Sequence, residues 1–372
     1  MKCPVRRGAA DAIDVAVTDR VDFQHLEAVW RELETRANPS FFQSWTWMGC
    51  LATERFPNPV LVEARQGGRV VALALFNRRG RTLYLGASGI PALDCIYVEF
   101  NGVLAEAGRE AALSRACLRA ARGGGVFGRR LVLDGVDDIA RAAAEEPGQA
   151  CAVRSQASPF VCISGQERDF LARRGANTRY QIRRSDRYYA GDGAIVLTRA
   201  ETLPQALEQL DRLAVPHQAS WSARGRQGAF DQPFFRRFHR ALLESAIPRG
   251  EADLWCASAG GRPIGYLYNF RYRGRVLAYQ SGFEYGDAGP HGKPGLTCHH
   301  RAIVEAAETG MNRYDFLAGD GRYKVNLADE AETLHWIEVD SRYAPRPVAR
   351  WLRDRVRRWV EARGLTGRSG IG

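Results

Sequence analysis

Three short apolar runs joined by tight glycine turns occur twice in this chain, and this repeat constrains the fold more than any other feature. The first set reads PVLVEA, RVVALALF and TLYLGA, and the second reads EADLWCASA, RPIGYLYNFRY and RVLAYQSGFEY. The turns fall at residues 66–68 and 79–80 in the first set, and at 260–261 and 273–274 in the second. Because strands joined by so few residues pair as antiparallel neighbours, each set predicts a three-stranded meander.

Segments with helical spacing of apolar residues surround each meander. In the first half they cover residues 22–36 and 105–122, and the strand RLVLDGV follows. In the second half, helices are expected at 203–215 and 232–246, then at LTCHHRAIVEAAETG, with the strands NRYDFL and LHWIEV after it. The shared helix–meander–helix–strand order indicates a structural duplication of an α+β unit. A length of 372 residues fits two such domains.

An arginine-rich segment separates the two halves. The run QERDFLARRGANTRYQIRRSDRYYAGDG holds seven arginines. We therefore expect an N-terminal domain over 1–163, a linker helix over 164–192, a C-terminal domain over 193–342, and a basic C-terminal helix and tail over 343–372. The arginines of the linker form either a solvated helical face or a surface for an anionic substrate.

The charge balance of the chain is strongly basic. A net charge of +11 and a pI of about 9.5 predict attraction to anions such as nucleotides, coenzyme A, nucleic acid, acidic glycans or anionic lipid. High-GC coding produces a similar arginine excess without any such ligand. The last helical segment, PVARWLRDRVRRWVEARG, has one apolar stripe and arginines on its other face. It either makes a peripheral contact with an anionic membrane or packs on the second domain.

The cysteines indicate a reducing compartment. Eight cysteines are present, none in a CxxC pair or at zinc-ligand spacing, and most lie in apolar runs. The first twenty residues lack the apolar core of a signal peptide, and no run has the length of a transmembrane helix. We therefore expect a cytoplasmic protein with buried thiols and no metal site. The sequence does not indicate an oligomeric state.

A glycine- and proline-rich loop, GDAGPHGKPG, follows the second meander and leads into a helix. The helix starts at Leu296 or Thr297, and its N-terminus offers unpaired N–H groups and a partial positive charge. Gly295 permits close approach to the backbone and Lys293 adds charge, so the loop suits a phosphate group. No GxxxxGK[ST] string occurs, so this is not a Walker loop. A plain strand-to-helix turn is the alternative.

The strings KPGLTCHHRAIVEAAETGMNRYDFLAGDGRYK and NTRYQIRRSDR resemble the Fem-related, CelD-like branch of GNAT acyltransferases. The H-x-x-x-W spacing at 217–221 and the aromatic stretch FFQSWTWM, followed by a meander and Asp94, are also similar. The resemblance spans about residues 38–340 and is sharpest in YDFLAGDGRYK. It implies two tandem GNAT-like (acyl-CoA N-acyltransferase) domains, each a mixed, mostly antiparallel sheet flanked by helices.

The resemblance also implies a co-substrate and an acceptor. Only the second domain would keep the coenzyme A loop, while the first would serve as scaffold and acceptor-side wall. Acetyl-CoA or another acyl-CoA is the implied donor. The implied acceptor is an amine or hydroxyl of a small molecule or glycan, such as a sugar or amino sugar in polysaccharide or envelope metabolism. The chain departs from the family at Lys293, where serine is frequent, and at Glu284, the acid before the loop, so both identities stay open.

Acyl transfer from a thioester needs a base for the acceptor, a polarised carbonyl and a proton for the leaving thiolate. Glu284 is the candidate base, and an exposed turn carboxylate is the alternative for this residue. Tyr323 is the candidate acid or hydrogen-bond donor for the thiolate. The candidate acyl-CoA contacts lie on the last meander strand and the loop: Gln280, Ser281, Gly282, Lys293, Gly295, Leu296 and Thr297.

A further set of residues is expected to bind the substrates. These are His217, Trp221, Arg183, Asp315, Asp320 and Lys324. The two basic residues suit a phosphate or a carboxylate. For Asp315 the alternative is a buried acid paired with an arginine, and for Asp320 it is a turn former. For His217 it is a core contact with its aromatic neighbour.

Three functions remain open at this point. The first is N- or O-acyl transfer from acyl-CoA. The second is Fem-type aminoacyl transfer from charged tRNA, which the arginine-rich segment suits. The absence of a sustained heptad run for a coiled-coil arm speaks against this second function. The third is a non-catalytic binding protein with a degenerate GNAT fold.

Overall fold

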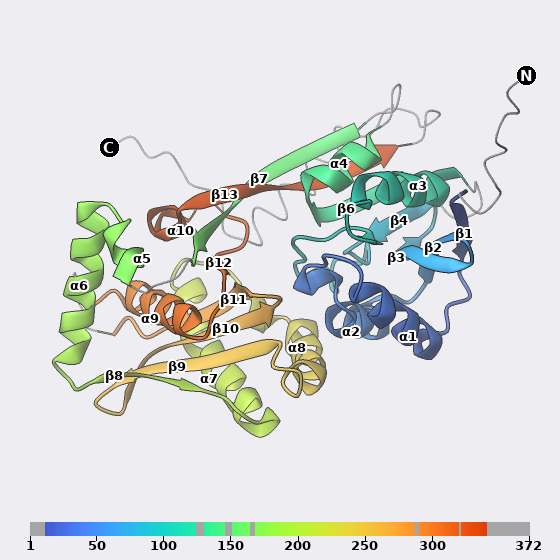
Figure 1. Ribbon diagram of the computed structural model, residues 1–372. Helices are drawn as coiled ribbons and strands as arrows, with labels where there is room; N and C mark the ends of the chain where they lie inside the picture. The colour runs from blue at the N-terminus through green and yellow to red at the C-terminus, as the bar shows by residue number, and fades with distance from the viewer. Residues whose placement is uncertain are drawn as a thin grey trace, which may run out of the picture. The chain divides into compact units, whose positions relative to one another are not determined.

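The computed structural model describes residues 12–123, 130–145, 151–163, 168–286, 289, 291–319 and 321–340, and every structural statement below refers to these residues. They divide into two compact units. The first holds the described residues up to Gln156 and those from Thr333 onward, and the second runs from Ala157 to Glu332. Both are α+β units built on mixed, mostly antiparallel sheets with flanking helices (Figure 1). The expected basic helix over 343–372 lies outside the described residues.

The sheet of the first unit has the strand order β1–β2–β3–β4–β6–β13. All neighbours are antiparallel except β4 and β6, which run parallel. The three strands expected from the first meander are β2, β3 and β4. The bounds are β1 (Asp14–Thr18), β2 (Pro59–Gln66), β3 (Arg69–Arg79), β4 (Thr82–Leu85), β6 (Arg130–Val136) and β13 (Glu330–Asp340), and the short β5 (Leu104–Ala105) pairs with β3.

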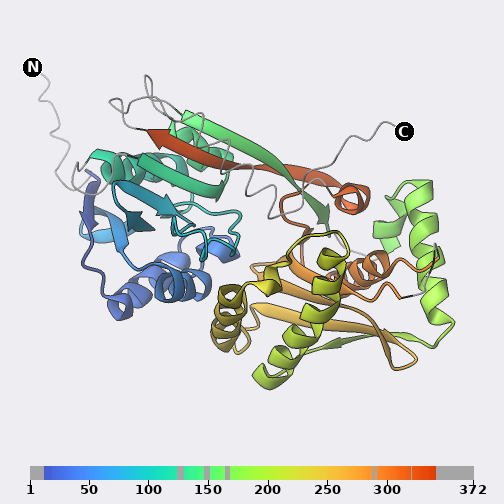
Figure 2. The ribbon, with the colours of Figure 1, turned by 180° about the vertical axis from the view of Figure 1, so that it is seen from behind.

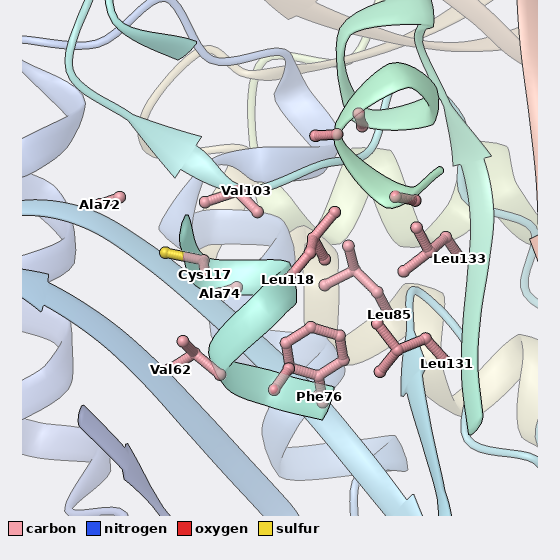
Figure 3. Packing of buried hydrophobic residues seen from close by; sticks show 14 of the residues in the cluster. Val62, Ala72, Ala74, Phe76, Leu85, Val103, Cys117, Leu118, Leu131 and Leu133 are labelled. Carbon is pink, nitrogen blue, oxygen red and sulfur yellow. The ribbon is translucent and has the colours of Figure 1, made fainter. Parts of the chain in front are cut away.

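The helices of the first unit pack on this sheet around an aliphatic core. They are α1 (Phe23–Glu34), α2 (Trp45–Arg55), α3 (Glu110–Gly123) and α4 (Asp138–Ala144). The start of α1 is set by Asp22, whose carboxylate accepts hydrogen bonds from two amides of the first turn. Leu118 of α3 packs among Phe76, Leu85 and Leu133 of the sheet, all almost fully buried (Figure 3). The core is thus a sheet covered by the apolar stripe of a helix.

The sheet of the second unit has the order β8–β9–β10–β11–β12–β7. Its neighbours are antiparallel except β11 and β12, which run parallel, so strand order and directions match those of the first unit. The second meander is β9, β10 and β11, as expected. The bounds are β7 (Cys151–Cys162), β8 (Ile195–Arg199), β9 (Ala252–Ala259), β10 (Arg262–Tyr272), β11 (Arg275–Phe283) and β12 (Arg313–Asp315).

In each sheet, the strand beside the parallel pair comes from the other half of the sequence. β13 pairs with β6 along residues 335–340, although we expected LHWIEV to close the domain over 193–342. β7, which the sequence pattern did not indicate as a strand, pairs with β12. A strand's partner is set by long-range pairing, which the local apolar pattern does not encode. The expected boundary at 163 therefore falls beyond β7, inside the second unit.

The expected linker helix belongs to the second unit. Its described part forms α5 (Arg168–Ala172) and α6 (Ala176–Ala190), and Ile182 and Tyr189 of α6 are buried in that unit's core. The remaining helices are α7 (Leu203–Ser222), α8 (Pro233–Ala246), α9 (Pro294–Glu308) and α10 (Arg322–Leu327). None of the described helices is long and apolar enough to cross a membrane.

Two glycines show that α9 and α7 pack on opposite faces of the second sheet. A Cβ on Gly265 would lie 3.2 Å from the Cys298 sulfur of α9, whereas a Cβ on Gly282 would lie 2.3 Å from the Leu213 carbonyl oxygen of α7. Figure 2, seen from behind, accordingly shows α7 and α8 in front of these strands. α7 also continues through Pro216, where the sequence predicted an end at residue 215. Its packing on β11 outweighs the hydrogen bond that proline removes.

Candidate active site

The parallel strands β11 and β12 separate soon after they begin. Residues 275–277 lie opposite residues 313–315, and β12 then ends. β11 continues to Phe283, with β10 on one side and none of the described strands on the other. We call residues 280–283 the open edge of β11. Backbone groups that point outward from such an edge have no ladder partners and are available to a ligand.

A β-bulge introduces this edge. Tyr268 lies opposite Gln280 and Asn269 lies opposite Ala278, so Tyr279 is an extra residue in β11. Its ring is buried beside His239 of α8, with the ring centroids 5.1 Å apart. A bulge bends its strand and increases the local twist. The bend therefore falls just where β11 leaves β12.

The backbone groups of Ser281 and Phe283 point away from β10. The Glu284 amide donates to the Ile264 carbonyl at 3.0 Å, so these two residues form a hydrogen-bonded pair of the antiparallel ladder. Because hydrogen-bonded and non-hydrogen-bonded pairs alternate, residues 283 and 281 are non-hydrogen-bonded positions. Their N–H and C=O groups consequently face the open edge. Two amides aimed in one direction can stabilise negative charge on an acyl oxygen.

His217 of α7 reaches the same edge. Its Nδ1 lies 2.9 Å from the Ser281 carbonyl oxygen, which only accepts, so the ring proton sits on Nδ1. Nε2 is buried and has no hydrogen-bond partner among the described residues. Burial lowers the pKa of His217, against the opposing effects of the Ser281 carbonyl and Asp231. The ring is therefore neutral at neutral pH, with its lone pair on Nε2. Trp221 flanks it with ring centroids 6.0 Å apart.

The loop before α9 does not present an open phosphate site, because α6 already fills it. The Ser185 hydroxyl accepts a hydrogen bond from the Lys293 amide at 2.9 Å and lies 2.8 Å from the Thr297 hydroxyl. The Lys293 ammonium donates to the Gln181 side-chain oxygen at 2.7 Å. Lys293 and Thr297, two of the residues that we expected to bind coenzyme A, thus contact α6 in this structure. A phosphate there has to replace these contacts.

The rest of the first turn of α9 is also occupied. Pro294 has no N–H, and the amides of Leu296 and Thr297 both donate to the Lys293 carbonyl, at 3.0 and 3.2 Å. The Phe283 ring lies against Gly295, 3.2 Å from the position that a Cβ would take. Glycine lets the Phe283 ring at the end of β11 pack closely on the start of the helix.

An aromatic cluster joins the open edge to α10. Tyr323 is 40% exposed, and its ring stacks on His299 with centroids 5.5 Å apart. The His299 ring also contacts Phe283 at 5.8 Å and lies with its Nδ1 2.9 Å from the Tyr314 hydroxyl. Partial burial in this cluster, and then the neighbouring Tyr285, raises the pKa of Tyr323 to about 12. The Tyr323 hydroxyl therefore stays protonated and is a hydrogen-bond donor at neutral pH.

Two expected substrate-binding residues have structural partners instead. Asp315 is fully buried, and its oxygens bind Arg275 and Arg313 at 3.0 and 2.7 Å. This is the buried-acid alternative, and it leaves no oxygen for a substrate. The Lys324 ammonium donates to the carbonyls of Leu317 and Ala318 at 3.1 and 3.0 Å, so it supports the turn after β12 rather than a ligand.

The remaining candidates are scattered. Glu284 is exposed just after β11, and Arg183 is exposed on α6. Asp320 lies outside the described residues. Sequence reasoning missed Gln181 and Ser185, which are four residues apart and therefore share one face of α6. The signal was present, but it required α6 to be seen as a packed helix rather than as a linker.

The comparison with protein families bears on this site. Residues 176–325 match the family described as acetyltransferase (GNAT) domain. The match begins at α6, ends in α10 and includes the whole open edge of β11. Residues 176–325 form a GNAT domain. With this GNAT domain the chain is an acyltransferase. The sheet of the first unit repeats the strand order of the second unit's sheet, to which the GNAT domain contributes β8 to β12.

Three solved structures share the fold over most of the chain. The C-terminal domain (DUF2156) of a putative lysylphosphatidylglycerol synthetase from Agrobacterium fabrum has a TM-score of 0.58 at 10% identity, covering 94% of this chain and 100% of that one. FemX has a TM-score of 0.55 at 9% identity, covering 87% and 96%. L-PGS from Bacillus licheniformis has a TM-score of 0.54 at 13% identity, covering 90% and 96%. Identities this low show the fold alone. No curated protein matches the chain.

Proposed function

We propose that the GNAT domain transfers an acyl group from acyl-CoA to an amine or hydroxyl, with a sugar or amino sugar of polysaccharide or envelope metabolism as the acceptor. The observation that carries this proposal is the open edge of β11. The amides of Ser281 and Phe283 face that edge. A thioester carbonyl placed against them accepts hydrogen bonds that strengthen as charge develops on its oxygen, and this lowers the barrier to attack.

Tyr323 suits the other half of the reaction. When the tetrahedral intermediate collapses, the coenzyme A thiolate leaves and takes a proton or a hydrogen bond. Tyr323 lies on the aromatic cluster that reaches the end of β11 through His299 and Phe283. Because its pKa is about 12, the hydroxyl is protonated when the thiolate forms and can donate to it.

The phosphates of the donor belong at the start of α9 in this proposal. A helix N-terminus of this length favours an anion. Lys293 supplies a positive charge, but its ammonium donates to Gln181 and its amide to Ser185. Binding then exchanges contacts with two uncharged acceptors on α6 for contacts with an anion, and an ion pair between ammonium and phosphate is the stronger kind of hydrogen bond.

Calorimetric titration with acetyl-CoA and with coenzyme A tests this proposal. The unsubstituted protein should bind both with micromolar Kd, and Lys293→Ala should weaken both by about tenfold, which is the effect of one charge-assisted hydrogen bond. Arg262→Ala is the matched control, because this substitution also removes one positive charge, and Arg262 is exposed on the β9–β10 hairpin. Absence of binding at moderate salt would rule out an acyl-CoA donor.

A second candidate, aminoacyl transfer from charged tRNA, draws support from α6. This helix already binds the loop before α9 through its contacts with Lys293. It also carries the exposed residues Arg183, Arg187, Tyr180 and Tyr188. Basic and aromatic side chains on one helix suit nucleic-acid phosphates and bases. If this candidate is right, tRNA binding weakens steeply with salt, and each arginine-to-alanine change reduces the salt slope by about one. A salt slope that the two changes leave intact excludes it.

A further inference from the structure

We propose that His217 is the general base of this site, and that its Nε2 takes the proton from the acceptor amine or hydroxyl as that group attacks the acyl carbonyl. The inference rests on the proposed acyl transfer but is independent of the donor's identity. The balanced step is simple. A bond forms between the acceptor N or O and the acyl carbon, the acceptor proton moves to Nε2, and the protonated ring later returns it to the leaving group or to solvent.

The tautomer of His217 is fixed by the strand that carries the open edge. The Ser281 carbonyl, 2.9 Å from Nδ1, accepts the only ring proton of the neutral form. Nε2 then holds the lone pair, and it is a buried nitrogen without a partner among the described residues. Buried polar atoms are normally paired, so one left over points to a ligand. The same backbone residue, Ser281, presents its amide to the acyl group, which couples the base to the oxyanion donors.

Gly228 lies against the imidazole of His217, where a side chain would crowd Nε2. A Cβ at this position would lie 3.3 Å from Nε2 and 3.1 Å from Cδ2 of His217, and 3.2 Å from the Trp221 ring. The backbone angles of Gly228, φ −82° and ψ 166°, suit any residue. Glycine is therefore explained by the room that it leaves next to the imidazole and not by its conformation.

The charged groups around His217 suit a base that is protonated only during the reaction. Asp231, in the turn Ala229–Asp231, favours the imidazolium, whereas Arg224, just after α7, disfavours it. Asp231 is held in place by the Gly228 amide, at 2.7 Å, and by the side chain of Gln218. Burial lowers the pKa of His217, so the ring is neutral before the acceptor arrives. By contrast, Glu284, the base expected from the sequence, is exposed rather than buried.

Two substitutions test the role of Nε2 as a base separately from the structural role of the His217 side chain. His217→Asn keeps an N–H at the position of Nδ1 for the Ser281 carbonyl and deletes the lone pair. Gly228→Ala keeps the imidazole and covers Nε2 with a methyl group. His25→Asn is the matched control, because His25 is exposed on α1 in the first unit. The readouts are coenzyme A release from acetyl-CoA with glucosamine as acceptor, donor affinity by calorimetry, and nitrogen NMR of the ring.

We expect kcat to fall by about 100-fold or more in both variants, the usual loss of a general base, with donor affinity within about twofold. The unsubstituted protein should lose kcat/KM as pH falls below the pKa of His217, and His217→Asn should abolish this acid limb. Ring NMR should show the proton on Nδ1. Unchanged turnover with the same acid limb in His217→Asn, or a proton on Nε2, overturns the inference. If the unsubstituted protein binds no acetyl-CoA, the proposed donor fails instead, and the NMR result still decides the tautomer.

Discussion

The Nδ1 of His217 and the carbonyl oxygen of Ser281 lie 2.9 Å apart, and this contact ties α7 to the open edge of β11. The next residue, Gly282, approaches α7 so closely that a Cβ would lie 2.3 Å from the Leu213 carbonyl oxygen. One helix–strand contact thus positions the candidate base together with the amides of residues 281 and 283. Because this close approach requires that residue 282 has no side chain, adding one methyl group at Gly282 tests it.

Gly282→Ala should destabilise the second unit. The added methyl meets the α7 backbone at the Leu213 carbonyl oxygen and the His217 nitrogen, and overpacking of this kind costs about 1–3 kcal/mol. Urea unfolding measures the loss, with Gly175→Ala as the control, since a Cβ there meets nothing within 4 Å and φ is negative. Equal free energies of unfolding for the two variants would mean that α7 does not pack against the edge as described.

Asp315→Asn tests the structural role of this acid. Arg275 and Arg313 lose the buried charge that they bind, and breaking such a pair costs about 3 kcal/mol. Glu208→Gln is the control, because its ion pair with Arg212 is exposed and contributes less than about 1 kcal/mol. The measurement is the free energy of unfolding in denaturant. Unchanged stability with lost substrate binding would restore the substrate-binding role expected from the sequence.

Asp94 in the first unit should contribute a pH-dependent part of the stability. Burial opposes its ionisation, but the Arg55 charge, 2.6 Å away, and the hydrogen bonds from Ser88 outweigh burial and lower the pKa of Asp94. A carboxyl with a lowered folded-state pKa stabilises the fold above the unfolded pKa, about 4, and loses this effect as pH falls through the folded pKa.

The test is the difference in unfolding free energy between the unsubstituted protein and Asp94→Asn. It should be about 3 kcal/mol at pH 7, because Asn leaves the buried Arg55 without its counter-charge, and it should shrink toward zero below pH 4. Asp14→Asn, an exposed position on β1, should show no such trend. A difference that stays constant with pH would contradict the assigned ion pair.

Tyr323→Phe should slow turnover without weakening the donor complex. The ring that stacks on His299 remains, and only the hydroxyl that serves the leaving thiolate is lost. We expect kcat to fall by about 10- to 100-fold with a calorimetric acetyl-CoA affinity near that of the unsubstituted protein. Tyr180→Phe on α6 is the control, because its ring is exposed. Equal kcat values for the two variants would remove Tyr323 from the reaction.

Local patterns predicted the meanders and most helices. Tight glycine turns force antiparallel pairing, so β2 to β4 and β9 to β11 followed directly from the sequence. Pro216 hid the last turns of α7, because proline inside a helix is normally a stop signal. β7 was missed, and the pairing of β13 with β6 was not predicted, because the partner of a strand depends on residues far away in sequence.

In the candidate site, too, the sequence predicted local features and missed contacts between residues far apart in the chain. The sequence pointed to residues 280–284 and to the start of α9, since a strand end followed by a helix start is a local signal. It did not show that Ser185 of α6 takes the Lys293 amide, because that contact joins residues 108 positions apart. Nor did it distinguish His217 as a substrate-binding residue from His217 as a core residue, and it did not indicate His217 as a base. The contact with the Ser281 carbonyl, on which the proposed base rests, joins residues 64 positions apart, and only the fold brings them together.

The central claim is that an acyl donor binds along the open edge of β11, and amide hydrogen exchange followed by NMR tests it most directly. Saturating acetyl-CoA should slow exchange at the amides of Ser281 and Phe283, which face the edge. The amides of Gly282 and Glu284, which face β10, should exchange as before. Unchanged exchange at Ser281 and Phe283 in protein that calorimetry shows to be saturated would place the donor elsewhere and contradict the account.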